Sequence, residues 1–411
     1  MMSVNKSSAP QDERYGWVMV GVTFVLSGLA FGSLGSVGIF LKPLIADFGW
    51  TRGEASAGYT TMAVASGICG IFWGIAADRF PLRYLVLTGV LAMSGSLLLL
   101  GNLTTLWQYY LFYFLFGAVG HGALVGPLYA TTGHWFRRNP GIALGIMTAG
   151  SGVGQGIVPF VARMLITEGG WQSAYTILGI SYLIIGLPIV FLVRESSARL
   201  QAMSNSGKVA DEDAFVLPPK EVVAWLSFAV IFCCICMAVP IVQLVPLVSD
   251  RGVDPKLAAG VIMVLMLSGA VGRVFAGRLA DKIGALQSYI IMGFGQAVLV
   301  VWFPFVTSVA GTYILAAAFG LIYSGVMANI IICLRIMVPA RFAGRAMGVG
   351  GAFALGGMGF GGFFGGYLFD VTGSYVWSFT MAGAIGLINV VVTLAFLARV
   401  RRQERVVAAA A

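Results

Sequence analysis

The chain has 411 residues, of which 59% are hydrophobic and only 10% are charged, and its mean hydropathy is +0.91. Soluble globular domains carry about 25% charged residues, because a surface in contact with water must be largely polar, so this composition excludes a soluble fold. The formal net charge of +9 does not indicate nucleic-acid binding either, because the basic residues flank apolar runs and do not gather in one patch.

Twelve apolar runs, each long enough to cross a bilayer as a helix, follow one another along the chain. A span needs about 20 apolar residues, and a β-barrel would show short alternating segments instead. The first sixteen residues are polar and the first run is too long for a signal h-region, so we expect no cleavable signal peptide. The predicted spans are about 17–41, 56–77, 84–103, 107–131, 141–165, 173–193, 221–247, 257–280, 286–306, 310–334, 343–368 and 374–398.

The basic residues are distributed unevenly between the two sides of the membrane. With the N-terminus inside, nineteen of the 25 Lys and Arg residues fall in cytoplasmic segments, five fall outside, and Arg273 lies within a span. This asymmetry follows the positive-inside rule. We therefore predict a multi-pass protein of a bacterial inner (plasma) membrane with both termini in the cytoplasm.

An internal repeat relates the two parts of the chain. Three ungapped matches at one offset indicate a duplication, and a unit of six spans, an even number, gives both copies the same orientation. The sequence therefore predicts an all-α polytopic membrane protein with two parallel six-helix halves, 1–193 and 221–411, joined by a polar cytoplasmic linker at 194–220. The matches, each 203 residues apart, are Pro43–Gly49 with Pro246–Gly252, Gly74–Arg79 with Gly277–Lys282, and Arg138–Gly145 with Arg341–Gly348.

One repeated motif combines a glycine with an acidic and a basic residue at the cytoplasmic ends of the second and eighth spans. Glycine allows another helix to approach, and the carboxylate can meet the positive end of a helix or an arginine of another loop. Such contacts would hold an inner gate closed, although a basic turn that only sets topology is the simpler alternative. The predicted gate residues are Gly74, Asp78, Arg79, Gly277, Asp281 and Lys282.

Several motifs resemble those of known transporters. The segment Gly74–Arg83 resembles the major facilitator motif between the second and third helices, and Gly277–Gly284 resembles its weaker second copy. Within that superfamily, Trp135–Gly150 resembles the fifth-helix motif of the monocarboxylate transporters, and Tyr15–Trp17 resembles the end of their first-helix motif. The resemblance covers nearly the whole chain. It implies the major facilitator fold, with twelve transmembrane helices, and carriage of a small organic anion.

The chain also departs from these families. Animal monocarboxylate transporters have a first-helix lysine where Gly35 aligns, and an aspartate one turn before the eighth-helix arginine where Gly269 stands. The related oxalate–formate exchangers use a lysine in the eleventh helix, but no Lys or Arg occurs between Ala346 and Leu397. A single cation within the spans favours a monocarboxylate over a dianion.

Arg273 is the strongest candidate for binding substrate. A charged side chain within a span costs about 2.5–3.5 kcal/mol on insertion scales, so it needs a partner or a wet cavity. Its planar fork suits bidentate binding of a carboxylate, and it matches the eighth-helix arginine that binds substrate in the monocarboxylate transporters. The alternative is an arginine that extends its side chain to the cytoplasmic interface.

His121 is the second candidate, near the middle of the fourth predicted span and flanked by glycines. An imidazole without a partner is costly in a bilayer, and histidine titrates near neutral pH. The repeat pairs His121 with Ser324, next to Tyr323. We therefore expect His121 and Tyr323 to line one cavity with Arg273, with His121 either contacting the substrate or relaying a proton. The alternative is a structural histidine.

The remaining substrate-binding candidates lie on the tenth and eleventh spans. Phe319 lies one turn before Tyr323, and the pair would form an aromatic wall that excludes water and strengthens a carboxylate–arginine contact,. Phe353 and Asn329 are weaker candidates. Aromatic residues that only pack or face lipid remain the alternative.

Together these features predict a secondary transporter of lactate- or pyruvate-like monocarboxylates that works by alternating access as a monomer, with a co-transported proton. Anion exchange of the oxalate–formate type, or carriage of another small solute by a major facilitator protein, stays open. We expect no enzyme activity, because neither His121 nor His134 has a nearby acidic residue in the sequence. We also expect no metal or other cofactor and no nucleic-acid partner. The five cysteines lie inside apolar runs and show neither a disulfide nor a zinc spacing,.

Overall fold

A computed structural model describes residues 13–50, 52–136, 140–196, 216–339 and 342–410. Most of the predicted linker 194–220 lies outside these residues, as do Arg138 and Arg341 of the repeat. The helices are α1 (Glu13–Phe48), α2 (Arg52–Ala77), α3 (Leu82–Leu100), α4 (Leu106–Leu115), α5 (Gly122–Thr132), α6 (Pro140–Phe191), α8 (Pro219–Ser249), α9 (Pro255–Ile283), α10 (Ala285–Val300), α11 (Val309–Ile336), α12 (Ala343–Thr372) and α13 (Tyr375–Ala410).

Most helices cover the apolar runs that predict them, although α10 ends at Val300, before the predicted 306, and α13 continues beyond the predicted 398. Ten of the described helices are long and apolar enough to cross a membrane, and α10 is a shorter apolar helix. The 52-residue α6 holds two of the predicted spans, because Gly170 has φ +77° and breaks it into two helices. A Cβ is strained at such a φ, which is why glycine marks the break. The predicted all-helical, polytopic fold is confirmed.

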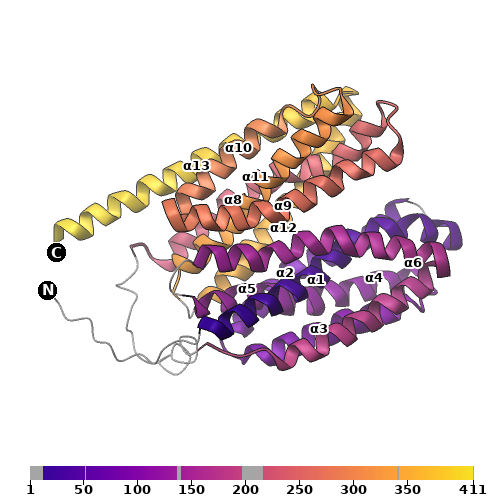
Figure 1. Cartoon of the computed structure of the whole chain (residues 1–411), viewed down its shortest axis with the longest axis horizontal. Coiled ribbons are helices and arrows are strands. Elements are labelled where there is room, and N and C mark those ends of the chain that lie inside the picture. The colour runs from indigo at the N-terminus through magenta and orange to yellow at the C-terminus, as the bar shows by residue number, and fades with distance from the viewer. Residues whose placement is uncertain (1–12, 51, 137–139, 197–215, 340–341, 411) are drawn as a thin grey trace.

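Two bundles of six spans lie side by side (Figure 1). Helices α1–α6 form one bundle and α8–α13 form the other, coloured indigo to magenta and red to yellow in the figure. Within the bundles α1 packs mainly on α6 and α8 mainly on α12, whereas α6 with α9 and α2 with α12 pack between the bundles. These four helices therefore form most of the interface between the halves.

The fourth span is irregular. It consists of α4, a π-helical turn at Phe116–His121, α5 and a 3₁₀ turn at Gly133–Trp135. A single π turn inside an α-helix places one extra residue in the turn and is frequent at functional sites. The π turn therefore changes the direction in which His121 points relative to a regular helix.

At one end of each bundle, a side-chain hydrogen bond joins two helices of that bundle, and the two bonds match. The Tyr110 hydroxyl donates to the Glu54 carbonyl at 3.0 Å, and the Tyr313 hydroxyl donates to the Leu257 carbonyl at 2.8 Å. Both members of one bond lie 203 residues from those of the other, so the repeat recurs in the contacts. In a further pair, Asp47 accepts from the Trp171 indole at 2.6 Å, and Asp250 accepts from the Tyr375 hydroxyl at 2.5 Å.

Candidate functional site

Arg273 lies in α9 at the interface between the bundles. Its side chain is only 7% exposed and is directed across the interface to α6. The Nη1 group donates to the Thr148 carbonyl and to the Ser151 hydroxyl. The guanidinium therefore binds the opposite half and does not extend to the end of its own helix.

The remaining donors of Arg273 set what it can bind. Its Nε atom is shielded from solvent and has no hydrogen-bond partner among the described residues. A buried donor without a partner costs about 1–3 kcal/mol, so this edge of the guanidinium is ready to bind an acceptor. The Tyr129 hydroxyl of α5 lies close to Arg273, Ser27 and Ser151, which makes the surroundings of the guanidinium polar.

Sequence reasoning missed Tyr129, Thr148 and Ser151. Tyr129 lies eight residues after His121 and so on nearly the same face of the fourth span, which was an available signal. Thr148 and Ser151 belong to the segment whose motif was used only to recognise the family. Nothing in the sequence pairs them with Arg273, because they come from the other half of the chain.

His121 ends the π turn and is buried, with 6% of its side chain exposed. Its Nδ1 atom is 2.6 Å from the Ser66 hydroxyl of α2, and its ring meets Phe31 of α1 edge to face at 4.8 Å. Its Nε2 atom has no partner among the described residues. The imidazole therefore lies among α1, α2 and the fourth span. One ring nitrogen is hydrogen-bonded, and the other has no hydrogen-bond partner among the described residues.

The two aromatic candidates of α11 are brought together. Phe319 and Tyr323 stack with ring centroids 5.4 Å apart, and both are buried. The Tyr323 hydroxyl contacts the Met266 sulfur of α9 at 3.3 Å, and Phe319 packs on Phe303 at 5.6 Å. The pair thus stacks and packs within the second bundle, and its role as an aromatic wall stays a prediction.

Asn329 and Phe353 lie elsewhere. Asn329 is fully buried and donates to the Ser288 hydroxyl of α10 at 2.8 Å, so it binds a neighbouring helix of its own bundle. Phe353 is 44% exposed on α12. In the described part of the chain, no hydrogen bond or ring contact joins His121, Tyr323 or Asn329 to Arg273.

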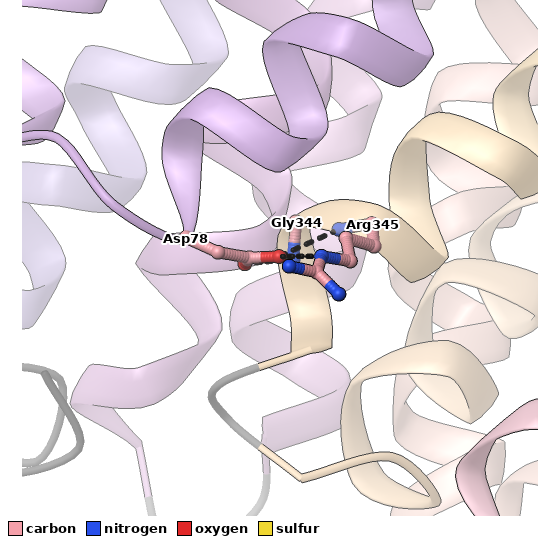
Figure 2. Close-up of polar contacts among 3 residues, drawn as sticks. All are labelled: Asp78, Gly344 and Arg345. Atoms are coloured by element: carbon pink, nitrogen blue, oxygen red, sulfur yellow. Dashed lines mark hydrogen bonds and ion pairs between the residues drawn. The ribbon is translucent and has the colours of Figure 1, made fainter. Parts of the chain in front are cut away.

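The first predicted gate motif lies at the crossing of α2 and α12. The Asp78 carboxylate accepts from the backbone N–H groups of Gly344 at 3.0 Å and Arg345 at 3.3 Å, and it pairs with Arg345 Nε at 3.5 Å (Figure 2). A Cβ on Gly74 would overlap the Gly344 carbonyl oxygen. Asp78 therefore caps the N-terminus of a helix in the other half, where the helix dipole favours a negative charge.

The second copy of the motif repeats this arrangement at the crossing of α9 and α6. The Asp281 carboxylate accepts from the N–H groups of Gly141 at 2.8 Å and Ile142 at 3.0 Å. A Cβ on Gly277 would overlap the Gly141 carbonyl oxygen. We call the end of the molecule that holds these two crossings the Asp78 end, and in this structure it is closed.

The basic members of the motif behave differently. Arg79 and Lys282 are exposed, and it is Arg345, absent from the predicted gate, that pairs with Asp78. A further cross-bundle contact comes from Arg335 at the end of α11, which donates to the Gly133 carbonyl at 3.2 Å. Backbone carbonyls and N–H groups thus supply most of the gate partners, and these are invisible in a residue pattern.

Comparison with known proteins shows to which family the chain is similar. A family model described as Major Facilitator Superfamily matches residues 23–356. The uncharacterized MFS-type transporter YcxA of Bacillus subtilis is 27% identical over 278 residues, which cover 66% of this chain and 67% of YcxA. Monocarboxylate transporter 13 of Bos taurus is 26% identical over 391 residues, covering 91% of this chain and 88% of that protein.

A solved structure shows the same fold. The proton:xylose symporter XylE, bound to 6-bromo-6-deoxy-D-glucose, superposes with a TM-score of 0.72 at 14% identity, covering 93% of this chain and 96% of the symporter. At this identity the likeness concerns the arrangement of the helices and not the residues that contact a solute.

Proposed function

The chain belongs to the Major Facilitator Superfamily, whose members are transporters, and from this premise we propose that it carries a small monocarboxylate across the membrane by alternating access, coupled to a proton. The observation that carries the proposal is Arg273, a buried guanidinium at the interface between the halves with an unpaired Nε atom. The similarity to a monocarboxylate transporter over 91% of the chain supports the same substrate class.

A bound carboxylate would complete the Arg273 site chemically. The fork of the guanidinium can donate two parallel hydrogen bonds to one carboxylate, and the pair is neutral, which lowers the cost of crossing a low-dielectric interior. Phe319 and Tyr323 serve as the aromatic wall near this path, and His121 offers its Nε2 atom to the substrate or to a proton. Phe353 and Asn329 are retained as weaker contacts.

Anion exchange is a second candidate, and one observation favours it. The hydrogen-bond partners of Arg273 among the described residues are a carbonyl and a hydroxyl, so none of these partners is a carboxylate that could carry a coupled proton. A coupled proton would then travel on His121 or on the substrate. Exchange of one anion for another needs no such group.

The topology proposal follows from the basic residues. We place the Asp78 end and both termini in the cytoplasm of a bacterial cell, because the positive-inside rule assigns the basic segments to that side. The two halves are 1–193 and 221–411, joined by a linker at 194–220. A single chain, as a monomer, transports the substrate. With the Asp78 end closed, alternating access would expose the site to the outer side, and rocking of the halves would reverse this.

Uptake by the full chain in proteoliposomes tests the function. Labelled lactate and pyruvate should accumulate and should respond to an imposed pH gradient, whereas formate and oxalate test the exchanger alternative. Arg273→Gln should abolish uptake, and Arg273→Lys should lower it about tenfold or more, because a lysine ammonium lacks the planar fork. Arg278→Gln, an exposed position on the same helix, is the matched control and should transport normally.

Two results would contradict the proposal. One is uptake of a neutral solute with no uptake of any carboxylate. The other is an Arg273→Gln variant that transports monocarboxylate with an unchanged KM.

A further inference from the structure

The guanidinium of Arg273 has two edges with different surroundings. Nη1 is bound to α6 of the opposite half through the Thr148 carbonyl and the Ser151 hydroxyl. Nε, on the other edge, has no partner among the described residues and is shielded from solvent. Because a carboxylate can bind side-on to the Nε and Nη2 donors, the same side chain can hold the opposite half and a substrate at once.

The Ser151 hydroxyl is itself held in a fixed direction. It donates its single hydrogen to the Thr148 carbonyl at 2.8 Å, so only its lone pairs remain for Nη1. The Thr148 carbonyl accepts from both Ser151 and Arg273. These three groups form a closed set of hydrogen bonds, which fixes the plane of the guanidinium and hence the direction of its free edge.

The set exists at only one of the two crossings between the halves. The repeat places Gly70 opposite Arg273, Gly351 opposite Thr148 and Ala354 opposite Ser151. Gly351 keeps a backbone carbonyl, but Gly70 and Ala354 have no side-chain group that can donate or accept a hydrogen bond. Both crossings share the acidic cap and the glycine contact; they differ in the link formed by Arg273 at one and in the Arg345–Asp78 ion pair at the other.

We propose that Ser151 and the Thr148 carbonyl are a positioning latch that orients Arg273 for a substrate carboxylate only while the Asp78 end is closed. The latch joins α6 to α9, the same two helices that meet at Gly141 and Gly277. When this crossing opens, Nη1 loses both partners and the free edge loses its fixed direction. Affinity for the anion then falls on the side where it is to be released. The carboxylate part rests on the proposed function, whereas the latch between the halves does not.

The first test compares KM values on the two sides of oriented proteoliposomes. Ser151→Ala should raise the KM for lactate about three- to tenfold on the side opposite the Asp78 end, which is the size of one hydrogen bond. The KM on the Asp78 side should not rise. Ala354→Ser, the matched control at the symmetry-related position, should change neither KM. A KM that is unchanged on both sides, or raised equally on both, would overturn the positioning role.

The second test does not need a substrate. Spin labels at the exposed residues Tyr84 and Ile283, which lie in opposite halves at the Asp78 end, report its opening by pulsed EPR. Cys69, the one cysteine that is not buried, is replaced by Ser. Ser151→Ala should increase the ratio of open to closed molecules about three- to tenfold, and an unchanged distance distribution would overturn the latch. If the wild type carries no monocarboxylate, the proposed function fails while this measurement still decides the latch.

Discussion

At the scale of single residues, the two halves have diverged in chemistry while keeping their register. Position 70 is a glycine with open space where a side chain would begin, and its repeat partner is Arg273, whose guanidinium reaches into the other half. His121 is similarly unmatched, because its partner Ser324 has no ring. On the proposed function, a path lined by one cation and one imidazole would have a fixed chemical polarity, which a duplicated scaffold alone would lack.

His121 gives a prediction at this scale. His121→Ala removes the ring that contacts Ser66 and Phe31 and the unbound Nε2 atom, so lactate uptake should fall about tenfold. If His121 contacts the substrate, the loss is the same at every pH; if it relays a proton, the variant loses its response to a pH gradient. Ser66→Ala, which removes only the Nδ1 partner, should have the smaller effect. Normal transport by His121→Ala at every pH would exclude both roles.

At the scale of helices, close approach of glycine backbones determines how α6 crosses α9 and how α2 crosses α12. Each crossing places a glycine of one half against a carbonyl oxygen of the other, Gly277 with Gly141 and Gly74 with Gly344. Small residues let membrane helices approach closely, and packing rather than the hydrophobic effect drives their association. A closed Asp78 end therefore depends on there being no side chain at these positions.

The packing of the glycines predicts different outcomes for alanine substitutions at Gly277 and at Gly70. Gly277→Ala should shift the ratio of open to closed molecules about tenfold or more towards open, because the new Cβ would overlap a backbone carbonyl that cannot turn aside. Gly70→Ala should leave the ratio unchanged, because nothing lies within 4 Å of a Cβ at that position. The EPR distance between Tyr84 and Ile283 measures both. Thermal unfolding in detergent shows whether Gly277→Ala is folded, and a folded variant with a wild-type distance distribution would refute the steric account.

At the scale of the whole molecule, each half caps a helix of the other. Asp78 caps α12 and Asp281 caps α6, so the two halves are joined by the same electrostatic contact used twice about one pseudo-twofold axis. Hydrogen bonds to a charged group contribute about 1.5–3 kcal/mol each in mutational series, and the caps lie on different crossings. The two caps are therefore separate contributions to the closed state.

Hydrogen exchange can test whether the caps are independent. Asp281→Asn should speed exchange at the amides of Gly141 and Ile142 about tenfold without changing those of Gly344 and Arg345, and Asp78→Asn should do the reverse, because asparagine lacks the charge that favours the helix N-terminus. Contacts that are far apart and share no partner contribute additively, so the double substitution should show both effects unchanged in size. Loss of protection at both crossings from either single substitution would show that the caps are coupled.

The helical spans and the 203-residue register were predictable from the sequence, because a bilayer requires about 20 apolar residues per helix and a duplication leaves repeated motifs. The same register correctly paired Asp78 with Asp281, since both sit at equivalent helix ends. The kinds of partner, a helix N-terminus and an arginine of another loop, were also predicted, but not which residues supply them. Gly344 and Gly141 take part through backbone atoms, and Arg345 is the charged partner of Asp78.

Hydropathy determined that this protein crosses the membrane many times, and the internal repeat determined that its two halves run in parallel. Only the tertiary structure decided that Arg273 binds Thr148 and Ser151, that a π turn directs His121 towards Ser66, and that Asn329 turns to Ser288. The physical reason is that the sequence of a run does not fix the rotation of its helix about the helix axis. The length and polarity of the run fix how deep the helix lies in the membrane, but in an apolar solvent almost any face of the helix can point outward. Which face meets a neighbour is set by the packing of helices that are distant in sequence, and the chemistry of the path depends on that choice.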